Sequence, residues 1–87
     1  AQLHSQLRGY AGQYTFWQSN IAYYRNSALP NARSIVSNAT RGYQSGDIGY
    51  VEYAQALQTN LDIQKAYLEA INNANQAVIS IQYLINQ

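Results

Sequence analysis

Two apolar seams run through the second half of the sequence, and they constrain the fold more than any other feature. A seam is a set of positions that recur in alternating steps of three and four residues and so line one face of a helix. The first seam consists of Ala54, Leu57, Leu61, Gln64, Leu68, Ile71, Asn75, Val78, Gln82 and Ile85. The second seam is displaced by one residue, about 100° around the helix, and consists of Tyr53, Ala56, Asn60, Ile63, Tyr67, Ala70, Ala74, Ala77, Ile81 and Leu84. Because one neighbour requires only one seam, we expect a helix from about Tyr50 to Ile85 with a neighbour on either side.

The small and polar members of the seams indicate what kind of neighbours to expect. Three alanines of the second seam allow another helix to approach closely: Ala70, Ala74 and Ala77. Three polar members of the first seam are Gln64, Asn75 and Gln82. They either set the register of a helix pair at some cost in stability or face a wet interior. Both interpretations are compatible with a tube of helices.

The first half of the sequence predicts a helix with one seam and an interruption. The seam consists of Leu3, Leu7, Tyr10, Tyr14, Trp17, Ile21, Tyr24 and Ala28. Pro30 interrupts it, because proline lacks an amide donor and crowds the preceding turn. The apolar positions then resume out of step at Ala32, Ile35, Val36, Ala39 and Tyr43. We expect the helix to bend and continue; the alternative is a complete stop, with Pro30 in the first turn of a new helix.

Glycines between the two helical halves predict a hairpin tip at residues 44–49. Gly42, Gly46 and Gly49 fall within eight residues of each other, and Gly46 suits the left-handed conformation that often ends a helix. Asp47 can begin the next helix. The expected fold is therefore all-α: a long antiparallel two-helix coiled-coil hairpin over residues 1–87, with the first helix kinked near Pro30. The chain begins at Ala1 rather than Met, and we expect it to be part of a longer protein.

The composition argues against catalysis and against nucleic-acid binding. The net charge is +1, and the basic residues are scattered: Arg8, Arg25, Arg33, Arg41 and Lys65. Nucleic-acid binding requires a clustered basic face. His4 is the only histidine, and no Cys or second His accompanies it as a metal ligand. Without a nucleophile beside a base, the sequence predicts no enzyme, cofactor or metal site. It also contains no apolar run of about 18 residues, the length that spans a bilayer.

The tip and the helix after it resemble the TolC family of outer-membrane efflux channels. The resemblance covers roughly residues 20–87. It rests on Leu29-Pro30, on Tyr43-x-x-Gly46-x-Ile48, on Val51-Glu52-x-x-Gln55-Ala56, and on Asn75-Gln76-Ala77-Val78-Ile79, in this order and spacing. The segment from Gly46 to Ile85 is especially similar to the channel-like C-terminus of some heavy-metal cation efflux pumps of the resistance-nodulation-division type.

The resemblance implies a place in a trimeric assembly. In that family, helical hairpins from three protomers form a periplasmic tunnel, and other segments cross the outer membrane. It implies an adaptor-docking tip at Gly46, Asp47, Ile48 and Gly49. It also implies an entrance at Tyr43 and Glu52, with Gln55 where the family often carries a second acid, so that a strongly cation-selective constriction is in doubt. The implied partners are a periplasmic adaptor and an inner-membrane pump, and the implied location is the periplasm of a Gram-negative bacterium.

Two functions follow from these patterns. The first is a passive export duct, in which the chain forms part of the tunnel wall. The alternative is a soluble coiled-coil interaction module, such as the hairpin of an adaptor or a scaffold. A duct is expected to bury the side with Asn60, Tyr67, Ala74 and Ile81 against further hairpins, whereas a simple dimerising hairpin can leave it wet. In both cases we expect the isolated chain to self-associate.

Overall fold

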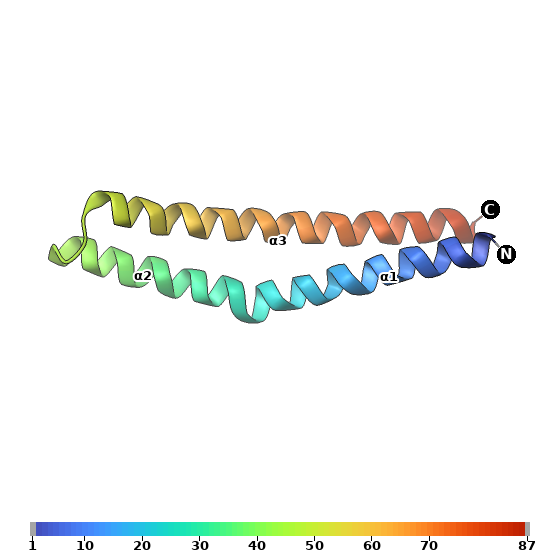
Figure 1. The fold of residues 1–87 in the computed structure, drawn as a ribbon, viewed down its shortest axis with the longest axis horizontal. Helices are drawn as coiled ribbons and strands as arrows, with labels where there is room; N and C mark the ends of the chain where they lie inside the picture. Colours follow the sequence, from blue (N-terminus) through green and yellow to red (C-terminus); the bar gives the residue numbers. More distant parts are fainter. Residues whose placement is uncertain (1, 87) are drawn as a thin grey trace. The chain divides into compact units, whose positions relative to one another are not determined.

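The computed structural model describes residues 2–86, which form helices and the turn that joins them. Helix α1 spans Gln2–Tyr23 and continues into a short π-helix, η1, at Tyr24–Ala28. Helix α2 follows at Leu29–Ser45, and after a turn helix α3 spans Tyr50–Ile85 (Figure 1). The expected all-α hairpin is confirmed. Ala1 and Gln87, which the expected hairpin included, lie outside the described residues.

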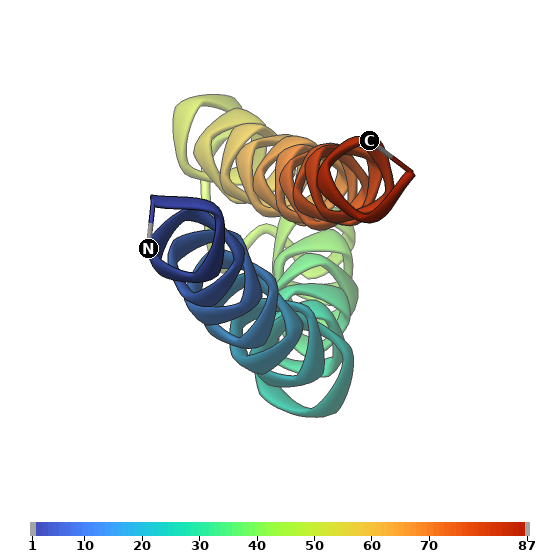
Figure 2. The ribbon, with the colours of Figure 1, turned by 90° about the vertical axis from the view of Figure 1, so that its right-hand side faces the viewer.

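The chain divides into two compact units. One combines α1, as far as Ala22, with α3 from Tyr67 onward, and the other contains Tyr23–Ala66. In the first unit, the start of α1 lies next to the end of α3 in both views (Figures 1 and 2). In the second unit, η1 and α2 form a hairpin with the first half of α3. Each unit is thus an antiparallel pair of helices.

The second seam of α3 faces the helix with which it pairs. Every member of this seam is buried or half-buried. Four of them are among the most buried side chains of the first unit: Ala70, Ala74, Ala77 and Leu84. Ala70 is 0% exposed. Ile21 on α1 is buried in the same unit, and Ala28 and Ala32 are buried in the other. Because alanine carries only a methyl group, this interface is narrow and the helices approach closely.

The π-helix explains the break in the first seam. The amide of Leu29 donates to the carbonyl of Tyr24, five residues back, which is the hydrogen bond of a π-turn. Residues 23, 28 and 29 all keep right-handed helical angles. Such a turn contains one more residue than a turn of α-helix, so the apolar positions that follow are rotated about the helix axis. The π-helix ends just before Pro30, whose ring would crowd the preceding turn of a regular helix. The helix therefore continues through Pro30 as expected, and the alternative of a complete stop is wrong.

The turn after α2 is a Schellman motif at Gly46, whose φ is 84° and ψ is 6°. The amide of Asp47 donates to the Gly42 carbonyl over 2.8 Å, and the amide of Gly46 donates to the Tyr43 carbonyl over 3.2 Å. The left-handed conformation expected at Gly46 is confirmed, and residues 46–49 lie between the helices. Helix α3 begins at Tyr50 rather than at Asp47. The Asp47 carboxylate instead accepts a hydrogen bond from Ser45 Oγ over 3.1 Å, which corrects the expectation that Asp47 begins α3.

Candidate functional site

The structure brings the four expected docking residues together in the turn. Gly46, Asp47 and Gly49 are exposed, whereas Ile48 is half-buried. The Ile48 side chain covers Gly42, where an added Cβ would lie 3.3 Å from Ile48 Cγ1. The Ile48 amide also donates to the Gly42 carbonyl over 3.2 Å. The turn is therefore folded back onto the end of α2, and it leaves its two outer glycines and Asp47 exposed.

Three tyrosines join the two helices beside this turn. The rings of Tyr43 and Tyr53 are stacked with centroids 4.9 Å apart, and Tyr50 meets Tyr43 edge-on at 6.3 Å. Tyr43, an expected entrance residue, is 43% exposed, and Tyr50 is 68% exposed. Sequence reasoning missed Tyr50 and Tyr53 as part of this site. Their three-residue spacing at the start of α3 was a signal, because it places both rings on nearby parts of one helical turn.

The other two expected entrance residues, Glu52 and Gln55, lie on the first two turns of α3. Both side chains are exposed. Glu52 lies in the first turn, where a carboxylate interacts favourably with the helix N-terminus. The exposed side chains of this region thus include one acid, one amide and the aromatic ring of Tyr50.

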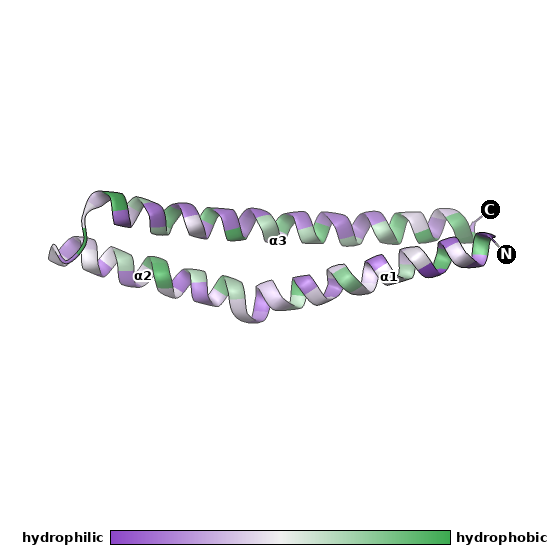
Figure 3. Ribbon diagram, viewed as in Figure 1, coloured by the Kyte–Doolittle hydropathy of each residue, from purple (hydrophilic) through white to green (hydrophobic). Residues whose placement is uncertain are grey.

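The first seam of α3 is largely uncovered. Its exposed apolar members, which we call the outer seam, are Leu57, Leu61, Leu68 and Ile85. Leu61 is 57% exposed and Leu68 is 64% exposed. Apolar residues recur along α3 in the hydropathy colouring (Figure 3). The side with Asn60, Tyr67, Ala74 and Ile81, which a duct is expected to bury against further hairpins, is already buried or half-buried within the single chain.

The first helical segment also exposes apolar side chains. Phe16 on α1 is 58% exposed and packs edge-on against Trp17, with ring centroids 5.0 Å apart. In the second unit, Tyr23 and Ile35 are 59% and 47% exposed. Each of the three directly precedes a half-buried residue, which places it beside the covered face of its helix rather than on it.

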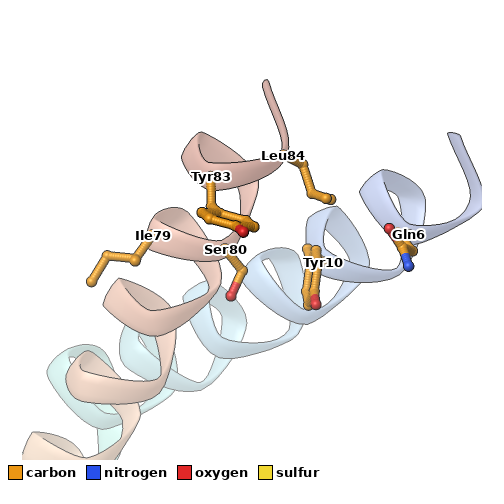
Figure 4. Close-up of a pocket in the computed structure, with 6 residues that line it drawn as sticks. All are labelled: Gln6, Tyr10, Ile79, Ser80, Tyr83 and Leu84. Atoms are coloured by element: carbon orange, nitrogen blue, oxygen red, sulfur yellow. The ribbon is translucent and has the colours of Figure 1, made fainter. Parts of the chain in front are cut away.

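A pocket of about 490 Å³ lies in the first unit, between α1 and the end of α3. It is lined by Gln6, Tyr10, Ile79, Ser80, Tyr83 and Leu84 (Figure 4). Leu84 is the most buried of the residues that line the pocket. The polar side-chain groups of the lining are hydroxyls and one amide. This lining offers hydrogen bonds but no charged group and no nucleophile with an adjacent base.

Other kinds of site were sought among residues 2–86. No cluster of three or more His, Cys, Asp or Glu side chains there is placed to hold a metal ion. None of the described helices combines the length and hydropathy required to cross a membrane. The exposed features of the described residues are the turn, the tyrosine cluster and the outer seam.

Comparisons with known proteins assign no family to the chain. No protein-family model, curated protein or solved structure matches it. The features of the chain that bear on its function are therefore the hairpin, its glycine turn and the apolar side chains that remain uncovered.

Proposed function

We propose that the chain is a hairpin of a helical export tunnel, of the kind formed by TolC-type efflux channels. In this proposal it belongs to a longer, trimeric outer-membrane protein and forms part of the periplasmic tunnel wall. It transports nothing by chemistry of its own, because a pump elsewhere supplies the energy. The proposed partners are other hairpins at the outer seam, and an adaptor at Gly46, Asp47, Ile48 and Gly49.

The observation that carries this proposal is the outer seam of α3. Within the hairpin, α3 already has one neighbour along its second seam, yet Leu57, Leu61 and Leu68 remain exposed on another face. A row of exposed leucines at heptad-related spacing costs solvation free energy unless another helix covers it. A helix in the wall of a tube requires a neighbour on each of two faces, whereas a helix in an isolated hairpin requires one.

The turn supports the same proposal. At a tunnel entrance, neighbouring hairpins must end at the same height along the tunnel axis, which requires a compact turn. The Schellman motif, with the Ile48 side chain over Gly42, is such a turn. The stacked pair of Tyr43 and Tyr53 holds the two helix ends together beside it. These contacts leave Glu52 and Gln55 exposed, as expected of side chains around an aperture.

The proposal can be tested in the cells that carry the gene, by changing Leu61 and Leu68 to Gln on the chromosome. Both side chains are more than half exposed within one chain, so the variant protein should still fold, while packing between hairpins is lost. We expect export to fail, so that fluorescent dyes or heavy-metal ions accumulate as in a strain that lacks the gene. The matched control is Thr59→Gln, which adds the same side chain at an exposed position outside both seams. Unchanged accumulation in the double variant, with normal protein levels, would contradict the proposal.

A further inference from the structure

We propose that the pocket in the first unit is a binding site for a small, uncharged molecule that combines an aromatic ring with a hydroxyl group. The pocket lies between α1 and the end of α3, within one compact unit (Figure 4). The site is therefore complete in a single chain. It goes beyond the tunnel function and does not depend on it, because it involves neither the turn nor the outer seam.

Helical spacing brings the lining residues to one place. Gln6 and Tyr10 are four residues apart and so lie one above the other on the same face of α1. The α3 side has two such pairs in adjacent rows: Ile79 with Tyr83, and Ser80 with Leu84. Ser80 is much shorter than its neighbours in these rows. A short side chain between longer ones leaves space between the helices that no side chain fills.

The volume and the walls of the pocket suit a ligand of one or two rings. A volume of about 490 Å³ falls within the range of small-molecule sites, which is about 300–1,000 Å³. Leu84 is 9% exposed, whereas Ile79 and Tyr83 are 55% and 66% exposed, so the pocket opens towards solvent on the side of these two residues. Tyr10 and Tyr83 contribute aromatic rings from the two helices (Figure 4). An aromatic ligand pairs favourably with such rings and covers apolar surface that water now contacts.

Four side chains of the lining can form hydrogen bonds with a ligand: Gln6, Tyr10, Ser80 and Tyr83. Within residues 2–86, none of their side-chain polar atoms forms a hydrogen bond with another residue. A hydrocarbon ligand would take water from these groups without replacing its hydrogen bonds, which costs free energy. A ligand hydroxyl both donates and accepts, so it can pair with the tyrosine and serine hydroxyls or with the amide. The lining therefore favours a phenol or an aromatic alcohol over a hydrocarbon.

The distribution of charge argues against an ionised ligand. No lining residue is charged, and α3 carries no charged side chain after Glu69. Arg8 is two residues from both Gln6 and Tyr10, a spacing that does not place side chains on one face of a helix, and it is exposed. A carboxylate or ammonium group in the pocket would lose hydration without an opposite charge beside it. We therefore expect the ligand to be neutral.

An NMR titration of the 87-residue chain with para-phenylphenol tests this proposal. The probe has two rings and is neutral at pH 7, since a phenol titrates at about pH 10. We expect saturable shifts of the amide signals of the six lining residues, and unchanged signals for Leu61 and Leu68 of the outer seam. The comparison ligand, para-phenylbenzoate, has the same rings but carries a carboxylate. It should bind at least about tenfold more weakly.

Two variants separate binding in the pocket from binding elsewhere. Ser80→Leu fills the space with an apolar side chain and should abolish binding. Tyr83→Ala removes one wall and should weaken binding by about tenfold. Tyr83 is 66% exposed, so its truncation should leave the helices intact, which circular dichroism verifies. The matched control is Tyr50→Ala, which truncates a tyrosine of the same helix that is 68% exposed and lies in the other unit. This control should bind the probe as the unmodified chain does.

The outcomes decide between a pocket ligand and other occupants. Loss of binding in both pocket variants, with binding retained by Tyr50→Ala, supports the proposal whether or not the chain belongs to an export tunnel. The absence of saturable shifts would overturn it, as would shifts along the outer seam that persist in both pocket variants. Pocket signals that change with protein concentration but not with the probe would show that a second copy covers the site, and would overturn it too. Equal affinity for the benzoate would overturn the assignment of an uncharged ligand.

Discussion

At Gly46 the backbone conformation itself selects the residue. Its φ of 84° is in the left-handed region, which costs an L-residue with a side chain about 1–2 kcal/mol. Nothing surrounds the position where its Cβ would be, so the penalty comes from the backbone and not from crowding. Gly12 is the opposite case: it lies in the interior of helix α1, and the position where its Cβ would be is equally open.

These two glycines predict opposite effects of one substitution. Gly46→Ala should lower the free energy of unfolding by about 1–2 kcal/mol, because alanine resists the left-handed conformation. Gly12→Ala should raise it by about 0.5–1 kcal/mol, because alanine favours a helix interior. Urea unfolding at equal protein concentration, followed by circular dichroism, measures both. Equal effects of the two substitutions would contradict the assigned turn.

Single residues at the turn also show how far the sequence could predict the candidate site. Gly46 was predictable because few residues other than glycine end a helix in this way. The role of Asp47 was not predictable from the sequence. Whether its carboxylate caps α3 or accepts a hydrogen bond from Ser45 depends on the residue at which α3 begins. The stacking of Tyr43 on Tyr53 was also hidden, because it depends on how the turn aligns two helices.

Among the elements, α3 shows most clearly what periodicity predicts and what it leaves open. Heptad spacing predicted the helix, its approximate ends and the angle between its two seams. It did not say which seam faces the chain's own first half, because either set of side chains can bury apolar surface. The structure buries the seam with Ala70, Ala74 and Ala77, whose small side chains permit close contact, and it leaves Leu61 and Leu68 outside.

The π-helix η1 predicts unequal effects of two deletions. Asn26 lies in η1, where one residue is already in excess of a regular helix, so its deletion can convert the π-turn into α-helix. Deletion of Ser37, which is also exposed, from α2 would rotate the residues before it by about 100° relative to α3. We expect deletion of Asn26 to lower the thermal midpoint less than deletion of Ser37. Thermal melts followed by circular dichroism test this, and the reverse order would contradict the assignment.

For the molecule as a whole, the main physical fact is how little of it is buried. Seven apolar side chains form the core of the described residues, and five of them are alanines. A chain of 87 residues with so narrow an interface gains limited stability from its own packing. Stability should therefore depend on protein concentration, because association covers the outer seam and the exposed aromatic residues of α1.

The dependence on association leads to a prediction for the isolated chain in solution. The unmodified chain should sediment as oligomers at micromolar concentration, since its exposed leucines gain free energy when another helix covers them. Changing Leu61 and Leu68 to Gln should shift it towards monomer and lower its thermal midpoint at high concentration, because both side chains are more than half exposed within one chain. The Thr59→Gln variant should sediment as the unmodified chain does. Sedimentation equilibrium that gave a strict monomer for the unmodified chain would rule out the outer seam as an association surface, since no other helix would then be covering it.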